Sequence, residues 1–202
     1  MPASRARGAG AGRVIAGSAR GIRLVAPGDA VRPLGDRLKQ ALFAMLEPEL
    51  RGRAFLDLFA GSGAGGIEVL SRGASSATFV ELDGRAVATI ARNLEAAHLA
   101  GPSATTVRAD VLDWLARGGA GRSFAIVLVD PPYDRPDLLV TTLERIAAAG
   151  RGVILAADGI VVAKHPARAA PPARIGLLAS ARERRFGESA LALYRWSDLE
   201  AA

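Results

Sequence analysis

The tetrapeptide Asp130-Pro131-Pro132-Tyr133 closes the most apolar run of the sequence, residues 123–130. Proline has no N–H and a fixed φ, so the two prolines make a stiff corner that offers only hydrogen-bond acceptors. These acceptors are the Asp130 carboxylate and the Pro131 carbonyl, and the Tyr133 ring can stack on a planar base. The pattern is typical of a site that holds an exocyclic amine of a nucleobase. A proline-terminated turn with an Asx-type bond would use the same residues.

An exocyclic amine is a poor nucleophile because its lone pair is delocalised into the ring. Hydrogen bonds from both amine hydrogens can localise that pair, and Asp130 would stabilise the positive charge that grows on the attacking nitrogen. A base inside a helix cannot reach such a corner, so its nucleotide must be unpaired or flipped out. The corner therefore predicts group transfer to the amine, with Asp130, Pro131, Pro132 and Tyr133 as the catalytic residues.

A glycine loop precedes this corner in the chain. Gly61, Gly63 and Gly66 form the pattern G-x-G-x-x-G between a predicted strand and a predicted helix, and Glu81 follows 20 residues after Gly61. Glycine lets the backbone approach a ligand, and a carboxylate at the end of the next strand can accept both hydroxyls of a ribose. This pattern fits NAD or another adenosine-bearing cofactor, or a tight turn without a ligand.

Two acidic residues favour S-adenosylmethionine over NAD. Asp57 stands four residues before Gly61, where its carboxylate can reach an α-ammonium group directly or through water, and NAD has no such group. Asp110 follows a third predicted strand and can accept from an adenine amine, while Val111 offers its backbone N–H. Asp110 is equally well explained as a helix N-cap.

Strands and helices that alternate along the chain must position these residues, which predicts an α/β fold with a parallel sheet. A small β-hairpin is expected over residues 13–27, and the C-terminal part of the sheet is expected to be antiparallel. The predicted strands are 54–58, 77–82, 104–110, 123–130, 159–165 and two within 175–196, and the predicted helices are 36–46, 67–72, 85–99, 111–117 and 136–150. Pro48 is expected just beyond the first helix.

The chain of 202 residues is long enough for one domain with a substantial core, so residues 13–202 are expected to form a single domain after a flexible basic tail, 1–12. The formal net charge is +6 and the pI about 10.8. The positive charge is clustered, because residues 1–28 contain five Arg and no acid, and residues 164–185 are also rich in Arg. This distribution favours binding to a nucleic acid over the alternative that the arginines only solvate the surface.

Several classes of protein are disfavoured. There is no cysteine, which excludes disulfides and thiolate metal sites and fits a reducing cytoplasm. Two histidines, His98 and His165, are too few and too far apart for a zinc site, so no metal is expected. The sequence has no apolar run near the roughly 18 residues that span a bilayer, and no secretory signal is expected at its start. A cytoplasmic monomer is the expectation.

With these residues placed, the chain resembles the bacterial 16S rRNA (guanine-N2)-methyltransferase family from about Arg13 to Trp196. The resemblance rests on "RVIAGSARGIRL", "RPLGDRLKQALF", "DLFAGSGAGGIEVLSRGA", "FVELD", "VDPPYD" and "RRFGESALALYRW". It implies a Rossmann-like class I methyltransferase with a seven-stranded, mostly parallel sheet whose last strand is antiparallel. It also implies S-adenosylmethionine as donor, and 16S rRNA of the small ribosomal subunit, or its assembly intermediate, as partner.

The resemblance extends to individual positions. The cofactor site is expected to comprise Asp57, Phe59, Gly61, Gly63, Glu81, Leu82, Asp110 and Val111, and the target guanine is expected at Asp130, Pro131, Pro132 and Tyr133. The RNA contacts are expected to be Arg13, Arg20, Arg23 and Arg32.

The chain departs from the family pattern at two places. Leu34-Gly35 replaces a polar pair after "RP", and Lys164-His165 stands where an acid is frequent. Three alternatives remain open: an adenine-N6 or cytosine-N4 nucleic-acid methyltransferase, an NAD-dependent dehydrogenase, and a non-catalytic RNA-binding assembly factor. The acceptor corner alone does not separate the amines of the three bases.

Overall fold

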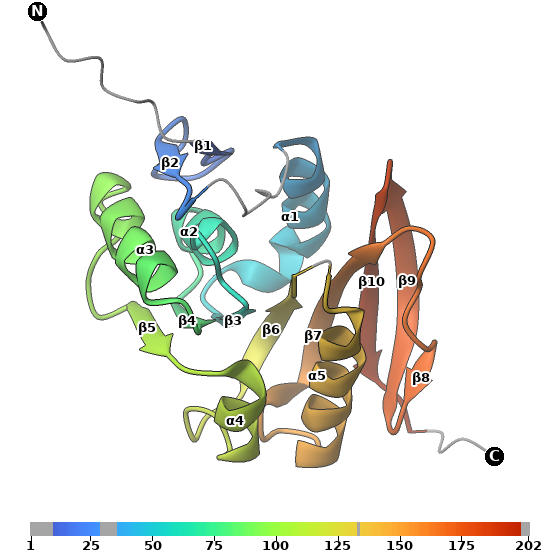
Figure 1. The fold of residues 1–202 in the computed structure, drawn as a ribbon. Helices are drawn as coiled ribbons and strands as arrows, with labels where there is room; N and C mark the ends of the chain where they lie inside the picture. The colour runs from blue at the N-terminus through green and yellow to red at the C-terminus, as the bar shows by residue number, and fades with distance from the viewer. Residues whose placement is uncertain (1–9, 29–35, 133, 199–202) are drawn as a thin grey trace, which may run out of the picture.

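The computed structural model describes residues 10–28, 36–132 and 134–198 (Figure 1). Four features predicted from the sequence lie outside these ranges: most of the tail, Arg32, the Leu34-Gly35 departure and Tyr133. Within the described residues, no helix is both long and apolar enough to cross a bilayer. No group of three or more His, Cys, Asp or Glu side chains in the same part of the chain is arranged to hold a metal ion.

The described residues contain one large sheet of eight strands in the order β5-β4-β3-β6-β7-β10-β9-β8. The five strands from β5 to β7 are parallel, and β10 lies antiparallel between β7 and β9. The seven predicted strands are all present, and the two-residue β8 is an addition to them. Their bounds are β3 Ala54–Leu58, β4 Ser76–Glu81, β5 Ala104–Arg108, β6 Phe124–Val129, β7 Leu155–Pro166, β8 Arg174–Ile175, β9 Leu178–Phe186 and β10 Ser189–Trp196.

Helices cover both faces of this sheet (Figure 1). The side chains of a strand alternate between faces, so Phe55 joins one core cluster and Leu56 the other. The first cluster packs under α1, α2 and α3, and the second under α4 and α5. The helices are α1 Asp36–Leu50, α2 Ala64–Ser71, α3 Gly84–Ala96, α4 Val111–Ala116 and α5 Pro136–Ala149.

Two predicted helix boundaries are wrong. Helix α1 continues through Pro48 to Leu50, because Leu46 and Leu50 extend its buried stripe and a proline in the last turn sacrifices a single backbone N–H bond. Helix α2 begins at Ala64, three residues earlier than predicted. Gly63 adopts the left-handed conformation just before it (φ 76°), and Gly65 and Gly66 form its first turn.

The N-terminal hairpin also differs from its predicted bounds. Its strands are β1 Gly10–Arg13 and β2 Arg23–Val25, which pair antiparallel. Residues 10–12, predicted to belong to the flexible tail, are therefore part of the hairpin. The sequence "GAG" carries no strand signal, and the strand forms because it pairs with β2 and because Ala11 is buried.

Candidate active site

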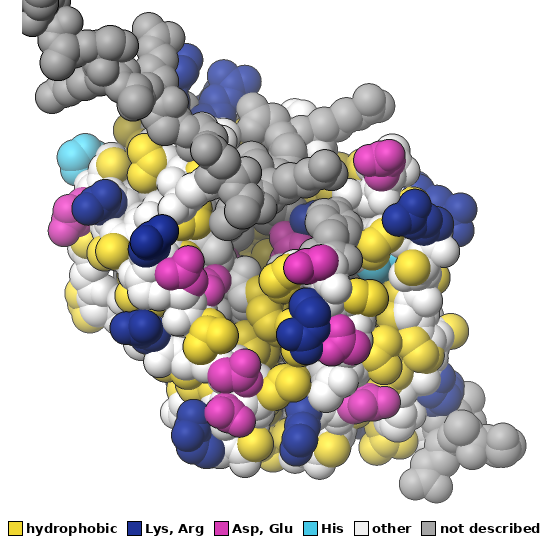
Figure 2. Space-filling model, viewed as in Figure 1, with side chains coloured by type: hydrophobic (Ala, Val, Ile, Leu, Met, Phe, Trp, Pro, Cys, Tyr) yellow, Lys and Arg dark blue, Asp and Glu magenta, His cyan; other side chains and the backbone are white. Residues whose placement is uncertain are grey.

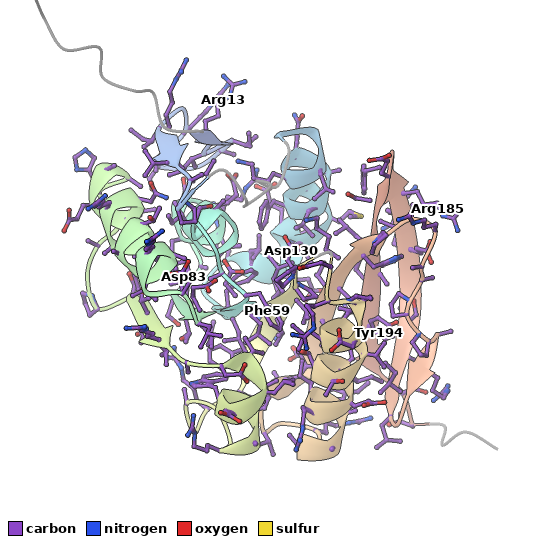
Figure 3. The ribbon with its side chains drawn as sticks, in the orientation of Figure 1. Arg13, Phe59, Asp83, Asp130, Arg185 and Tyr194 are labelled. Atoms are coloured by element: carbon purple, nitrogen blue, oxygen red, sulfur yellow. The ribbon has the colours of Figure 1, made fainter. Side chains whose placement is uncertain are left out.

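The predicted site residues follow four neighbouring strands at the carboxyl edge of the sheet. Asp110 follows β5, Glu81 ends β4, Phe59 follows β3 and Asp130 follows β6. Because β3 and β6 are neighbours in the sheet but not in the chain, this edge contains the point at which the strand order reverses. Ligands of open α/β sheets bind at such a point. Figure 3 shows Phe59 and Asp130 near the middle of this edge.

Asp57 lies beneath the glycine loop. The residue is 3% exposed, and its Oδ2 accepts a hydrogen bond from the Gly66 N–H at 2.8 Å. A Cβ on Gly65 would lie 2.9 Å from this oxygen, and one on Gly66 would lie 2.2 Å from the Phe79 ring. Glycine is therefore required at both positions for α2 to pack against the sheet. Contact between Asp57 and a ligand ammonium stays a prediction.

Burial raises the pKa of Asp57 to about 8. The Gly66 N–H bond opposes this shift, while the negative charges of Asp130 and Glu81 add to it. An acid in this state is largely protonated at neutral pH. A cationic group placed beside it would favour the ionised form.

Glu81 ties the glycine loop to the end of β4. Its Oε2 accepts from the Gly61 N–H at 2.8 Å, and its Oε1 accepts from the Asp83 N–H at 2.9 Å. The loop enters this contact through two left-handed residues, Phe59 (φ 61°) and Gly61 (φ 54°). Leu82 is 60% exposed directly after Glu81, which is unusual for a large apolar side chain. The pair thus offers a fixed carboxylate beside an apolar surface.

Asp110 is the N-cap of α4. Its Oδ1 accepts from the N–H groups of Leu112 at 2.8 Å and Asp113 at 3.1 Å, as the N-cap alternative predicts. Val111 is the first residue of the helix, where backbone N–H groups have no intrahelical partner. Recognition of adenine by these two residues stays a prediction.

Asp130 forms an ion pair that the sequence did not reveal. Lys164 on β7 donates from Nζ to Oδ1 of Asp130 at 2.8 Å and to Oδ2 at 3.0 Å. Val129 pairs with Ala163 in the parallel register of β6 and β7, so the next residue of each strand stands beside the other. In the sequence, Lys164 stands out only as the first residue of the basic segment 164–185 and as a departure from the family pattern, and the strand register is what places it beside Asp130. Burial raises the pKa of Asp130, although the Lys164 ammonium opposes the shift.

The two prolines of the corner form one wall of a pocket. The pocket has a volume of about 190 Å³, and its lining is largely apolar. Lys164 is part of the lining and joins the pocket to Asp130. The lining residues are Pro131, Pro132, Pro136, Leu139, Val140, Lys164, Pro166, Ala169, Ala170, Pro171 and Pro172.

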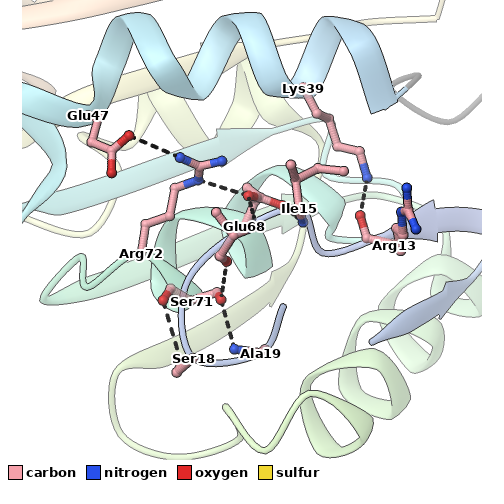
Figure 4. Close-up of polar contacts among 10 residues, drawn as sticks. Arg13, Ile15, Ser18, Ala19, Lys39, Glu47, Glu68, Ser71 and Arg72 are labelled. Carbon is pink, nitrogen blue, oxygen red and sulfur yellow. Dashed lines mark hydrogen bonds and ion pairs between the residues drawn. The ribbon is translucent and has the colours of Figure 1, made fainter. Parts of the chain in front are cut away.

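The N-terminal hairpin is held firmly on α2 and α1 (Figure 4). Glu68 on α2 is buried and accepts from the N–H groups of Ile15 at 2.8 Å and Ala16 at 3.1 Å. Ser71 accepts from the Ala19 N–H, and Lys39 on α1 donates to the Arg13 carbonyl at 2.6 Å. The side chains of Arg13, Arg20 and Arg23, which were predicted to contact RNA, are exposed on this anchored hairpin.

A second basic surface lies on the other side of the site. The side chains of residues 181–185 of β9 are all exposed, and they include Arg182, Arg184 and Arg185. Figure 3 shows Arg13 and Arg185 on either side of Asp130, and Figure 2 shows Lys and Arg side chains near the hairpin and, separately, on the side of β9. This charge is part of the distribution that favours a nucleic-acid partner, although none of these arginines was predicted individually as an RNA contact.

The chain is similar to known proteins over nearly its whole length. Residues 12–195 match the family model described as "Conserved hypothetical protein 95". YlbH of Bacillus subtilis is 35% identical over 91% of this chain and 98% of its own. "Ribosomal RNA small subunit methyltransferase D" of Escherichia coli K12 is 40% identical over 129 residues, which are 63% of each chain.

Solved structures agree with these sequence matches. The structure of yhhF from Escherichia coli superposes with a TM-score of 0.77 at 31% identity and covers 93% of this chain and 98% of its own. A TehB-like SAM-dependent methyltransferase from Corynebacterium glutamicum has a TM-score of 0.57 at 18% identity, and covers 79% of this chain and 86% of its own. The second likeness shows the fold alone, which is that of the SAM-dependent methyltransferases.

Proposed function

The chain belongs to the family described as conserved hypothetical protein 95, and from this premise we propose that it methylates the exocyclic N2 amine of a guanine in 16S rRNA of the small ribosomal subunit. The protein is an S-adenosylmethionine-dependent methyltransferase. The dehydrogenase alternative is set aside, because the relatives of this chain are named as rRNA methyltransferases.

The observation that carries the proposal is the set of acids at one edge of the sheet. Asp57 lies in the last part of β3, Glu81 ends β4 and Asp130 follows β6, and these strands are neighbours in the sheet. The acceptor-only proline corner begins at Asp130. When bound, S-adenosylmethionine supplies an electrophilic methyl group on a sulfonium sulfur. The glycine loop fits it, because Glu81 fixes the Gly61 backbone and an apolar surface at Leu82 stands next to that carboxylate.

Three groups of this chain would act on the base. The Asp130 carboxylate and the Pro131 carbonyl accept the two amine hydrogens, and the Tyr133 ring stacks on the base. Bonding of the amine nitrogen to the methyl carbon would break the methyl–sulfur bond, leave its electron pair on sulfur as a neutral thioether, and place positive charge on the nitrogen. Asp130, held in place before the reaction, stabilises that charge, and one amine proton then leaves toward the carboxylate. Asp57, Phe59, Gly61, Gly63, Glu81, Leu82, Asp110 and Val111 hold the donor.

The RNA is bound on both sides of the site. Arg13, Arg20 and Arg23 contact it from the hairpin, whose backbone is already fixed by Glu68 and Ser71. Arg32 is assigned to the same role from the sequence. We add the β9 arginines Arg182, Arg184 and Arg185, because phosphate contacts from both sides would orient a splayed nucleotide toward Asp130. The protein acts on the RNA as a monomer in the cytoplasm.

Nucleoside analysis tests the substrate. Small-subunit particles from a strain that lacks the gene are incubated with the purified protein and methyl-labelled donor, and the RNA is digested to nucleosides. We expect label in N2-methylguanosine. Label in N6-methyladenosine or N4-methylcytidine would overturn the choice of base. Particle binding without any label would support the assembly-factor alternative.

Two variants test the division of roles. Asp130→Ala should bind the donor with unchanged affinity and transfer no methyl group, because the acceptor of the amine is gone. Glu81→Ala should chiefly weaken donor binding, measured by calorimetry. Full transfer by Asp130→Ala would contradict the role of the proline corner.

A further inference from the structure

The ion pair between Lys164 and Asp130 has a role beyond stability. We infer that Lys164 is a positioning residue for methyl transfer, which holds Asp130 as an ionised acceptor in a single orientation for the target amine. This inference rests on the proposed function. It adds a residue to the transfer site that lies on a different strand and outside the Asp-Pro-Pro-Tyr corner.

The geometry of the pair fixes the carboxylate. Nζ contacts both oxygens at nearly equal distances, 2.8 Å and 3.0 Å, so rotation of the Asp130 carboxylate would break one bond. The Lys164 side chain is 6% exposed and that of Asp130 is 20% exposed. Lys164 is thus buried, whereas one side of Asp130 remains accessible. That side is the one available to an amine.

The charges around Asp130 explain why a cation is needed there. The negative charges of Asp130 and of Glu81 on β4 both raise the pKa of Asp57 on β3, so Asp57 and Asp130 are not readily ionised together. Burial further disfavours the ionised form of Asp130. Lys164 from β7 is the cation that opposes these effects. A protonated Asp130 would present an O–H donor in place of one of its acceptors.

A positive charge beside Asp130 also has a cost. It repels the positive charge that develops on the attacking nitrogen, so an ammonium is useful only if it keeps the carboxylate ionised. The role of Lys164 is therefore tied to pH. It matters most where Asp130 would otherwise be protonated, and matters little at alkaline pH.

Lys164→Met tests this role, because methionine keeps an unbranched side chain of similar length without the charge. An opposite charge within bonding distance lowers a carboxyl pKa by about 1–3 units. We therefore expect the acid limb of the kcat–pH profile to move up by at least about one pH unit, with roughly tenfold loss of kcat below it. The kcat should recover toward the wild-type value at pH 9. Lys164→Arg should restore the wild-type limb.

Three further measurements separate this role from a structural one. Donor affinity measured by calorimetry should be the same in Lys164→Met and wild type, because Lys164 acts through Asp130. Arg168→Met, which removes a neighbouring exposed charge, should leave the pH profile unchanged. The double variant Lys164→Met/Asp130→Asn should be no slower than Asp130→Asn alone, because Lys164 then has no carboxylate to hold.

A titration without substrate makes the test independent of the reaction. The free protein is labelled with ¹³C at the aspartate carboxyl carbons, and the Asp130 signal is assigned from Asp130→Asn. In Lys164→Met this signal should titrate at higher pH than in wild type. An unshifted titration, or a kcat lowered by one factor at every pH, would overturn the inference and leave the proposed function intact. Failure of the wild-type protein to label guanine would overturn the proposed function while leaving the titration interpretable.

Discussion

The side chain of Asn93 on α3 pairs with the backbone of Val25 on β2 as a second strand would. Its Oδ1 accepts from the Val25 N–H at 2.9 Å, and its Nδ2 donates to the Val25 carbonyl at 2.9 Å. The same Nδ2 donates to the Ser62 carbonyl in the glycine loop at 2.8 Å. One buried amide therefore joins the N-terminal hairpin to the glycine loop.

We expect Asn93→Ala to lower the free energy of unfolding by about 1–3 kcal/mol, because buried backbone groups lose their partners. Urea denaturation measures this loss. Donor affinity should also fall, since the Ser62 carbonyl is released. Arg92→Ala, an exposed neighbour on the same helix, is the matched control and should change neither quantity. Equal stability of Asn93→Ala and Arg92→Ala would show that the hairpin is held by other contacts.

Asp57 should make the stability of the protein depend on pH. The folded state keeps the Asp57 proton up to about pH 8, whereas the unfolded chain releases it near 3.8. Folding therefore takes up a proton between these values, and stability falls as pH rises through this window by at most about 1.4 kcal/mol per pH unit. Asp57→Asn keeps an acceptor for the Gly66 N–H and cannot titrate.

The measurement is the difference in unfolding free energy between wild type and Asp57→Asn at pH 5, 6, 7 and 8. Asp130 titrates in both proteins, so its effect cancels to first order in this difference. We expect the wild type to lose stability relative to the variant at each step. Parallel curves would mean that Asp57 is already ionised in the folded protein at neutral pH.

Gly66 should tolerate no side chain. Its added Cβ would lie 2.2 Å from the Phe79 ring, which is buried in the sheet, so α2 must move away. We expect Gly66→Ala to lower the unfolding free energy by about 1–3 kcal/mol and to weaken donor binding, because α2 carries the end of the loop. Gly28→Ala is the control, since nothing lies within 4 Å of its added Cβ. The double variant Gly66→Ala/Phe79→Leu should recover part of the loss.

Charge reversal on β9 should weaken RNA binding alone. In Arg182→Glu/Arg184→Glu we expect KM for the particle to rise and to depend less steeply on salt, because phosphate contacts are lost. Donor affinity should not change. Arg117→Glu, at the exposed C-terminal end of α4, introduces the same kind of charge away from the site and should behave as wild type. An equal rise in KM for both variants would indicate an effect of net charge rather than of a surface.

The sequence was informative wherever chemistry and local structure coincide. The glycines, Glu81 and the proline corner each follow or end a predicted strand, and together they predict the sheet of a methyltransferase. The predicted fold and family are confirmed. The roles of individual site residues stay predictions. The bounds of α1 and α2 were wrong because burial of Leu50 and packing of Gly66 against Phe79 are tertiary effects that overrule proline and glycine as stop signals.

The contacts between distant segments could not be predicted. Lys164 is 34 residues from Asp130, and only the register of β6 and β7 brings the two together. Likewise, nothing in the sequence distinguishes Glu68 and Asn93 from other polar residues of helices. In the structure, both side chains accept hydrogen bonds from the backbone of the hairpin. Such pairings depend on the topology of the whole sheet.

The place of β10 bears on how the chain is made. This strand follows β9 in the chain, yet it lies inside the sheet, between β7 and β9. The edge of β7 therefore stays uncovered until translation has passed Trp196, and a nascent chain stalled before Ser189 would expose it. By this reasoning, β7 and β9 become parts of one sheet only when β10 has left the ribosome.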